Sequence, residues 1–354
     1  MKRLFFLFFI CIFSFILFIG QSSAYPIFTE YFYLTQLALK QNPKEIPLPH
    51  NIALDSNDNV YVTIRDIDTN KGGWILKYEC NKKYLPLNPY KDAPKKIGSD
   101  KLKSPGSIAI DKVGNIYVKD TDPDRIVKFN SKGDFVKEWG DQTLELYSNP
   151  DKKYKMKSMA NLAMNPLGQL CVNDYDAARI YIFSPFGDLM DTWEYNKSQG
   201  GHMLIQFIGG KYWNVHFLGH GWIRRHTSKG DILPSVEIPI PQTSGAAVDL
   251  KGCFYLTDEY DDKYKDRVYK CGPDGKIITE FGTYGLGDGE FRLPRAIAVS
   301  PDGRHVFVVD YQNGRVQLWR AKEKKGPEMI KPPKEITLPP KKKPRIILQK
   351  RELR

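Results

Sequence analysis

One pattern of about twelve residues recurs along the chain, and it constrains the fold more than any other feature. Each copy has a short apolar strand, a turn rich in Asp, Asn, Pro and Gly, and a second apolar strand, which is typical of a β-hairpin. The copies are residues 51–62, 107–118, 161–172, 245–256 and 296–308. Their anchor positions in the turn are Asp55, Asp111, Asn165, Asp249 and Ser300.

The spacing of these copies predicts the architecture. The 84-residue gap between Asn165 and Asp249 leaves room for one more unit, and residues 203–215 fill it in degraded form. The resulting six units lie roughly 40 to 56 residues apart, which is the period of a four-stranded propeller blade. Third and fourth strands follow, for example Arg125–Phe129 and Phe135–Trp139. The prediction is an all-β, six-bladed β-propeller over residues 25–320.

Units two and six also carry a family resemblance. The stretches Ile108-Ala-Ile-Asp111, Gly114-Asn-Ile-Tyr-Val-Lys-Asp120 and Leu293-Pro-Arg-Ala-Ile-Ala-Val299 resemble NHL repeats, a family of propeller blades, and the resemblance spans about residues 46–320. Unit six runs from Trp319 straight into a Lys/Pro-rich tail and therefore lacks an outer strand. An unpaired edge exposes backbone donors and acceptors, so we expect residues 27–37 to supply this strand and close the ring.

The N-terminal segment predicts export. Lys2 and Arg3 precede an apolar run from Leu4 to Ile19, and Ser22-Ser-Ala24 follows. This order is typical of a secretory signal cleaved after Ala24, which makes residues 1–24 a signal peptide and places the protein outside the cell, in the periplasm or in the cell envelope. The alternative is an uncleaved membrane anchor.

The net charge of +12 is unevenly distributed. Residues 321–354 hold 12 Lys/Arg and 4 Asp/Glu and carry +8, and the leader carries +2, which leaves about +2 for residues 25–320. A nearly neutral body argues against a specific nucleic-acid partner. The tail is too charged and proline-rich to form a core and is predicted to be disordered. It either contacts anionic surfaces or only keeps the protein soluble.

Two cysteines of unit five are candidates for a disulfide. If Leu256 faces Val268, then Cys253 faces Cys271, and directly opposed residues of antiparallel strands are close enough to be bridged. An exported protein permits this bond, and we predict it. The alternative is a pair of free buried thiols.

Four units place an Asp at the end of strand two and an Arg at the start of strand three. A repeated pair of opposite charges is interpreted as a structural ion pair that braces each hairpin or adjacent blades, because repeats share their bracing contacts. The alternative is a ring of charges that binds a ligand. The pairs are Asp120/Arg125, Asp174/Arg179, Asp258/Arg267 and Asp310/Arg315.

The functional site is predicted at one mouth of the central channel. Strand one lines the channel of a propeller, and five residues before each anchor the units carry His50, Gly106, Ala160, Ser244 and Arg295, with His202 at or next to this position in unit four. The candidate ligand-binding residues are His50, Asn51, Asn161, His202 and Arg295. The candidate metal ligands are His50 and His202, which lie across the ring from each other.

A second resemblance concerns this mouth. Pro49-His50-Asn-Ile-Ala-Leu-Asp55 is similar to a motif of the peptidyl-α-hydroxyglycine amidating lyases, propellers that hold a zinc ion with three histidines at this location. The resemblance implies a divalent metal in the channel. Arg295 and Gly106 depart from the histidines of that pattern, and two candidate ligands fall short of the three that a catalytic zinc uses.

The leading hypothesis is an exported, monomeric propeller that binds a protein, peptide or glycan without catalysis and needs no cofactor. The alternative is a metal-dependent lyase or lactonase-like enzyme at the channel mouth. A third hypothesis is a structural envelope component tethered by an uncleaved leader and the basic tail. No Gly-x-Ser-x-Gly, phosphate-loop or His-Glu-x-x-His motif points to another enzyme class.

Overall fold

A computed structural model of the chain describes residues 28, 30–37, 39, 47–66, 72–81, 90, 92–121, 123–140, 143–165, 167–194, 203–208, 211–218, 220–226, 232–238, 240, 243–258 and 266–322. These residues belong to one compact unit, Met1–Lys322, and Glu323–Arg354 forms a second one. The predicted signal peptide, His202 and residues 323–354 of the predicted tail lie outside the described residues. The start of the predicted tail was wrong, because Ala321 is the last residue of β28 and the N–H of Lys322 donates to the carbonyl of Glu30. No helix long and apolar enough to cross a membrane occurs in the described part.

The regular elements of the described residues are strands, gathered into antiparallel sheets in chain order. The first sheet contains β2 (Pro47–Leu54), β3 (Val60–Asp66), β4 (Gly73–Tyr78) and β5 (Lys95–Leu102). The next contains β6 (Pro105–Ile110), β7 (Ile116–Asp120), β8 (Arg125–Phe129) and β9 (Phe135–Trp139). The third contains β12 (Met159–Met164), β13 (Leu170–Asp174), β14 (Arg179–Phe183) and β15 (Leu189–Glu194), extended by β10 (Leu144–Leu146) and β11 (Asn149–Tyr154).

The second half of the chain repeats this order. One sheet contains β16 (Met203–Ile208), β17 (Lys211–Leu218), β18 (His220–His226) and β19 (Ile232–Glu237). Another contains β20 (Thr243–Val248), β21 (Phe254–Asp258), β22 (Val268–Cys271) and β23 (Ile277–Phe281). The last contains β26 (Pro294–Val299), β27 (His305–Asp310), β28 (Arg315–Ala321) and β1 (Tyr31–Leu37). A parallel pair, β24 (Thr283–Tyr284) and β25 (Glu290–Phe291), precedes it.

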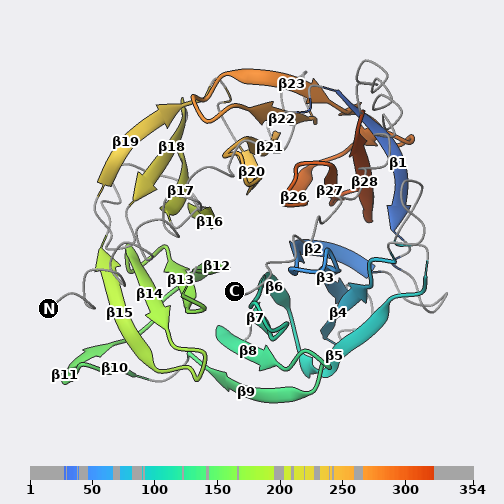
Figure 1. Ribbon diagram of the computed structural model, residues 1–354. Coiled ribbons are helices and arrows are strands. Elements are labelled where there is room, and N and C mark those ends of the chain that lie inside the picture. The colour runs from blue at the N-terminus through green and yellow to red at the C-terminus, as the bar shows by residue number, and fades with distance from the viewer. Residues whose placement is uncertain are drawn as a thin grey trace, which may run out of the picture. The chain divides into compact units, whose positions relative to one another are not determined.

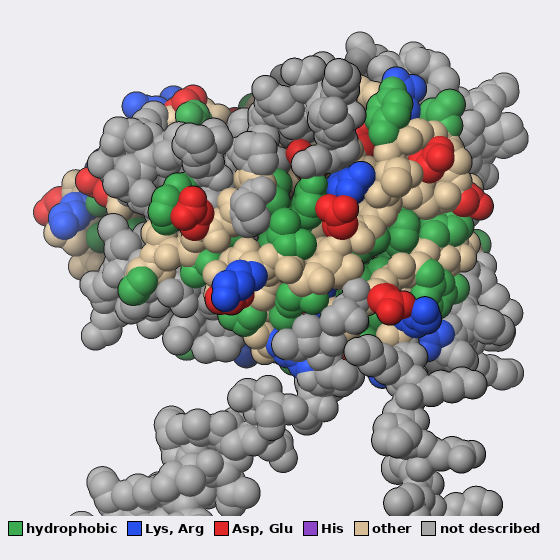
Figure 2. Space-filling view, turned by 90° about the horizontal axis from the view of Figure 1, so that it is seen from above, with side chains coloured by type: hydrophobic (Ala, Val, Ile, Leu, Met, Phe, Trp, Pro, Cys, Tyr) green, Lys and Arg blue, Asp and Glu red, His purple; other side chains and the backbone are tan. Residues whose placement is uncertain are grey.

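The sheets stand around a central axis, with the first strand of each nearest the axis (Figure 1). This arrangement is an all-β propeller. The strand β1 is separated from β28 by most of the chain, yet the two pair antiparallel from Tyr31 opposite Ala321 to Leu37 opposite Val316. On the face that Figure 2 shows, acidic and basic side chains lie beside one another, as expected for a nearly neutral body.

The recurring Asp of the turn explains why each inner hairpin folds as it does. The carboxylate of Asp55 accepts hydrogen bonds from the backbone N–H groups of Asn57 and Asn59 at 2.8 and 3.0 Å and from the Tyr61 hydroxyl at 3.0 Å. Asp111 and Asp249 make the corresponding bonds in their own sheets. A side chain that satisfies its own turn stabilises that turn locally. These residues are therefore part of the scaffold.

The hydrophobic core lies between neighbouring sheets. One buried cluster joins Leu37 of β1, Val62 of β3 and Phe307 of β27, so the N-terminal and C-terminal parts of the propeller share a core. In the sheets whose burial is described, the inner strands are buried on both faces, for example β3, β7, β13, β21 and β27, and these strands are nearly continuous apolar runs. Val62 and Phe307 are fully buried.

The predicted disulfide is wrong, because the register of β21 on β22 differs by one residue from the one we expected. Phe254 is opposite Cys271 and Leu256 is opposite Tyr269. Since successive side chains point to opposite faces of a sheet, Cys253 and Cys271 lie on different faces. Cys253 packs in the cluster of Val306 and Cys271 in the cluster of Ile223, and both thiols are free.

Candidate functional site

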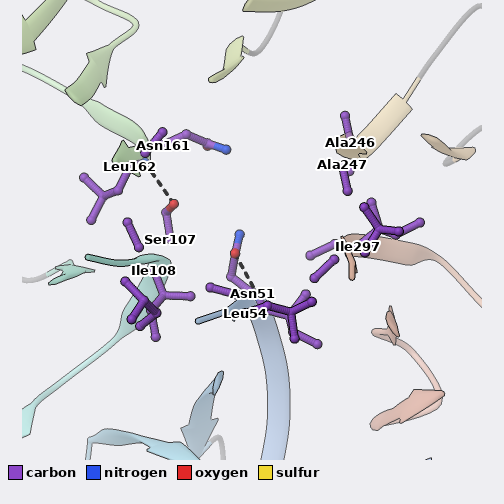
Figure 3. A pocket seen from close by; sticks show the side chains of 18 of the residues that line it. Asn51, Leu54, Ser107, Ile108, Asn161, Leu162, Ala246, Ala247 and Ile297 are labelled. Carbon is purple, nitrogen blue, oxygen red and sulfur yellow. Dashed lines mark hydrogen bonds between the residues drawn. The ribbon is translucent and has the colours of Figure 1, made fainter. Parts of the chain in front are cut away.

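The innermost strands enclose a channel that forms a cavity of about 310 Å³ (Figure 3). The Ile-Ala-Ile type segments of β2, β6, β12, β20 and β26 line it, and the surface that its wall exposes is more polar than apolar. Polar side chains occur where these strands begin. They are Asn51, Ser107, Asn161, Ser244 and Arg295.

Two of these polar groups hold neighbouring blades together. The Ser107 hydroxyl accepts a hydrogen bond from the backbone N–H of Leu162 at 3.0 Å, and the Ser244 hydroxyl donates to the carbonyl of Pro294 at 2.7 Å. In the same way, the Thr63 hydroxyl donates to the carbonyl of Gly106 at 2.8 Å. The hydroxyl groups at this level are therefore scaffold contacts.

The two asparagines are different. Asn51 uses its side-chain oxygen to accept the backbone N–H of Ile52 at 2.9 Å, which leaves its amide N–H groups toward the channel. The side chain of Asn161 also reaches toward the open centre, and its amide group points away from its own strand (Figure 3). Both predicted ligand-binding asparagines thus present donors to the channel.

His50 lies at the mouth on β2, with its ring edge-to-face to Tyr311 at a centroid distance of 6.4 Å. Its buried Nδ1 atom has no hydrogen-bond partner within the described part of the chain. Burial and then the charges of Arg65, Arg295 and Lys119 lower the pKa of His50 to about 3. The imidazole is therefore neutral at physiological pH and can accept or donate a hydrogen bond.

Three cations surround this histidine. The guanidinium of Arg295 stacks on the Tyr311 ring at 4.7 Å, and Arg65 donates from Nε to the carbonyl of Pro105 at 3.1 Å. Lys119 donates from Nζ to the carbonyl of Met159 and lies 3.8 Å from a carboxylate oxygen of Asp124. Burial, followed by the charge of Arg295, lowers the pKa of Arg65. Within the described residues only Lys119 of these three has a carboxylate within 4.0 Å, so positive charge predominates at the mouth.

Of the predicted mouth residues, Asn51, Asn161 and Arg295 line the cavity. His50 is not among the lining residues but lies near enough to Arg295 to feel its charge, and His202 lies outside the described residues. Within those residues no group of three His, Cys, Asp or Glu side chains could hold a metal ion. The cations around His50 would also repel a divalent ion. The described residues therefore do not form a zinc site of the three-histidine type.

Sequence reasoning missed Arg65, Lys119 and Tyr311. All three stand at or directly beside the end of the second strand, which an antiparallel hairpin returns to the mouth. The pairing of strands one and two could have indicated these residues. Leu48 at the start of β2 is opposite Arg65, and Pro105 at the start of β6 is opposite Asp120, which follows Lys119. Counting only the residues before strand one left out this half of the mouth.

The repeated arginines have two arrangements. Arg125 pairs with Asp120 at 3.0 Å and Arg315 with Asp310 at 2.7 Å, and both aspartates are fully buried. Arg179 and Arg267 instead form ion pairs with the fourth strand of their sheets. Arg179 pairs with Glu194 on β15, and Arg267 pairs with Glu280 on β23.

The acidic partners on strand four were not predicted. Arg125 also reaches Glu138 at 2.7 Å, so three of the four arginines tie strand three to strand four. The aspartates have backbone roles as well, since Asp174 accepts the N–H groups of Lys157 and Ser158. These charges brace the blades, and Arg125 also donates to the carbonyl of Lys101 on β5 of the neighbouring sheet.

Comparisons with known proteins place this geometry among propellers. No family model matches the chain. It is 32% identical over 85 residues to peptidyl-glycine alpha-amidating monooxygenase A of Xenopus laevis, and 31% identical over 93 residues to the mouse monooxygenase. The matches cover 23% and 25% of this chain and 9% of each relative. The chain therefore spans only a small part of these curated relatives.

Solved structures give a longer match at lower identity. A streptogramin B lyase structure aligns with a TM-score of 0.54 at 13% identity, over 83% of this chain and 98% of that chain. The virginiamycin B lyase of Staphylococcus aureus aligns with a TM-score of 0.53 at 13% identity, over 83% of this chain and 99% of that chain. At this identity the likeness concerns the fold. By its sheets and its likenesses, the chain is a β-propeller protein.

Proposed function

We propose that this chain is an exported, six-bladed propeller of NHL-type repeats that binds a protein, peptide or glycan at its channel mouth without catalysing a reaction. The single observation that carries the binding function is a set of polar side-chain groups at the mouth that form no hydrogen bond or ion pair within the described residues. These are the unpartnered Nδ1 of His50, the amide of Asn161 and the guanidinium of Arg295. Buried polar groups without partners are costly, so a ligand that satisfies them gains affinity.

The blade count and the closure of the ring belong to this proposal. The four-stranded repeats in chain order and the pairing of β1 with β28 support a ring whose ends meet in one blade. Such closure would hold the mouth rigid, because pulling the ends apart breaks both the β1–β28 pairing and the shared core around Leu37.

The proposal of a binding module without catalysis rests on the chemistry of the mouth. Acid–base catalysis needs a proton donor and acceptor whose pKa values lie near the working pH. His50, with a pKa of about 3, is a weak base, and the charges that act on it are the positive ones of Arg65, Arg295 and Lys119. This set is better suited to holding a ligand than to moving a proton.

The proposed location is outside the cytoplasm, with residues 1–24 as the export signal and residues 321–354 as a basic tail that contacts an anionic surface. The chain is proposed to act as a monomer. Mass spectrometry of the mature protein tests the export signal, since cleavage after Ala24 predicts Tyr25 as the first residue.

A metal-dependent lyase or lactonase-like enzyme is the second candidate. The likeness to streptogramin B lyase and virginiamycin B lyase, together with the short match to the amidating monooxygenases, favours it. Its ion would be held by His50 and His202.

The experiment that tests both candidates combines binding and metal content. The purified mature protein is applied to peptide and glycan arrays, and the same preparation is analysed for zinc and calcium beside a His50→Ala, His202→Ala double variant. Binding without a stoichiometric metal, and without any change in the captured ligand, supports the binding module. One metal ion per chain that the double variant loses, or conversion of the ligand, supports the enzyme and contradicts the leading proposal.

A further inference from the structure

We infer that the channel mouth is an oxyanion site, in which Arg65, Lys119 and Arg295 bind the carboxylate or phosphate group of the ligand. This inference rests on the proposed binding function and adds the chemical class that the mouth selects. It depends on three side chains from three different sheets, β3, β7 and β26, that the ring brings to one point.

The first step is proximity. All three cations act electrostatically on His50, and Arg65 and Arg295 act on each other. A methyl group added at Gly106 would lie 3.6 Å from the Arg65 guanidinium and 3.8 Å from Cδ of Lys119, so these two side chains converge on one glycine. Arg295 is held at the same place by Tyr311, whose ring also contacts His50.

The second step is the shortage of counter-charge. Among the described residues, neither Arg65 nor Arg295 has a carboxylate within 4.0 Å, whereas the repeated Arg125 and Arg315 each have one at 3.0 Å or less. Lys119 has Asp124, at a distance of 3.8 Å. Half-buried cations that repel one another are stabilised by a bound anion, and guanidinium groups suit planar carboxylate and phosphate oxygens.

The third step is access. Arg65 and Tyr311 also line an open groove of about 1200 Å³ that extends over β5 and β9. Charges of both signs line the groove, with Lys101, Lys103 and Arg125 beside Asp66, Asp100 and Glu138. Arg295 lines the channel itself. The anion site therefore lies where the groove meets the channel, and the groove has room for the rest of a larger ligand.

The experiment titrates the mature protein with sodium glucuronate, a carboxylate, and with inorganic phosphate, each at an ionic strength matched with sodium chloride. Isothermal calorimetry is expected to show that at least one of the two binds, and the stronger one identifies the group. Lys119→Ala and Arg295→Ala are each expected to weaken binding roughly tenfold or more, because a charge-assisted hydrogen bond is lost.

Two matched pairs separate the site from general charge effects. Lys112→Ala removes the same charge from the turn at the other end of the same hairpin, and it should leave the affinity unchanged. Gly106→Glu places a carboxylate beside Arg65 and Lys119 and should abolish anion binding, while Gly106→Gln, of equal size and uncharged, should retain it. Circular dichroism and melting temperature verify that each variant is folded. If the Gly106 variants do not fold, the comparison of Lys119→Ala with Lys112→Ala decides whether the inference holds.

The inference is overturned if neither anion binds better than chloride, if Lys112→Ala weakens binding as much as Lys119→Ala, or if Gly106→Glu binds like Gly106→Gln. Its failure is distinguishable from that of the proposed function. A neutral array ligand that is lost in Asn161→Ala would keep the binding module and reject the oxyanion. Binding of glucuronate or phosphate, with no peptide or glycan captured on any array, would keep the oxyanion site and reject the proposed binding of a peptide or glycan.

Discussion

The two ends of the inner hairpins differ in how their charges are satisfied. At the turn end, each recurring Asp accepts two backbone N–H groups and a tyrosine hydroxyl from its own hairpin, as Asp249 does with Tyr255 at 3.1 Å. At the mouth end, Arg65 and Arg295 carry charges that no described carboxylate within 4.0 Å neutralises. Charges that repeat from blade to blade serve the scaffold, and charges that occur in one blade only are available to a ligand.

The turn end should therefore be the more sensitive to loss of a charge. Asp249→Ala removes the acceptor of three hydrogen bonds from a residue that is 2% exposed, and should lower the free energy of unfolding by about 4 kcal/mol. Urea denaturation measures this loss. The exposed Asp191→Ala serves as the control, with a change below about 0.5 kcal/mol. If Asp249→Ala lowered the free energy of unfolding by less than about 1 kcal/mol, the turn end would be no more sensitive to the loss of a charge than the mouth end.

His305 tests the turn end of the last sheet, where Ser300 replaces the aspartate and accepts the backbone N–H of His305 at 2.9 Å. Burial lowers the pKa of His305 to about 4. Below pH 6.5 the unfolded chain therefore binds a proton that the folded one rejects, and stability falls as the pH drops from 6.5 toward 4. The contribution of this residue is at most about 3 kcal/mol.

The variant His305→Gln should make this decline of stability between pH 6.5 and 4 shallower, as measured by urea denaturation at several pH values. His50, whose pKa is lowered to about 3, contributes to the part that remains. The comparison is with the wild-type slope over the same range. An unchanged slope would mean that His305 is protonated in the folded protein.

The braced arginines should show an intermediate effect. Arg315 contacts the buried Asp310 through Nε at 2.7 Å and donates to the carbonyls of Gly287 and Glu290. Arg315→Ala is expected to cost about 2 kcal/mol of stability, because Asp310 loses a charged partner. Arg267, whose partner Glu280 is half exposed, should cost less than about 1 kcal/mol on the same change. Equal costs in chemical denaturation would reject the distinction between the two arrangements.

The smallest effect has the opposite sign. Arg65→Gln removes one of the mutually repelling cations at the mouth while keeping a hydrogen-bond donor, so it should raise stability by about 0.5 kcal/mol at low salt. The gain should shrink as sodium chloride rises to about 0.5 M, since salt screens the repulsion. A loss of stability at low salt would show that Arg65 braces the fold.

Much of the scaffold could be predicted from residues alone because the hairpins are local. Asp55, Asp111 and Asp249 recur at a fixed place in the turn, and their contacts run to residues two, four and six positions away. The strands β2, β6, β12, β20 and β26 follow from the same segments. The same pattern singled out His50, Asn51 and Arg295, although the structure has them within β2 and β26 and not before strand one.

The disulfide and the other half of the mouth could not be predicted in this way. A single-residue difference in register between β21 and β22 turned Cys253 and Cys271 to opposite faces, and apolar strands buried on both sides give no alternation from which to read the register. Arg179 and Arg267 form their ion pairs with glutamates on strand four. Local spacing in the sequence does not distinguish these glutamates from Asp174 and Asp258, which are nearer along the chain.

The sequence by itself determined the hairpins, their turns and the propeller class, because contacts between residues a few positions apart depend on nothing else in the chain. Only the tertiary structure decided that Arg65, Lys119 and Arg295 meet around one neutral histidine. These residues are separated by 54 and 176 positions, and the ring brings their blades to a common axis. Coulombic repulsion between the three charges opposes this meeting, so it is the packing of the blades that holds them there.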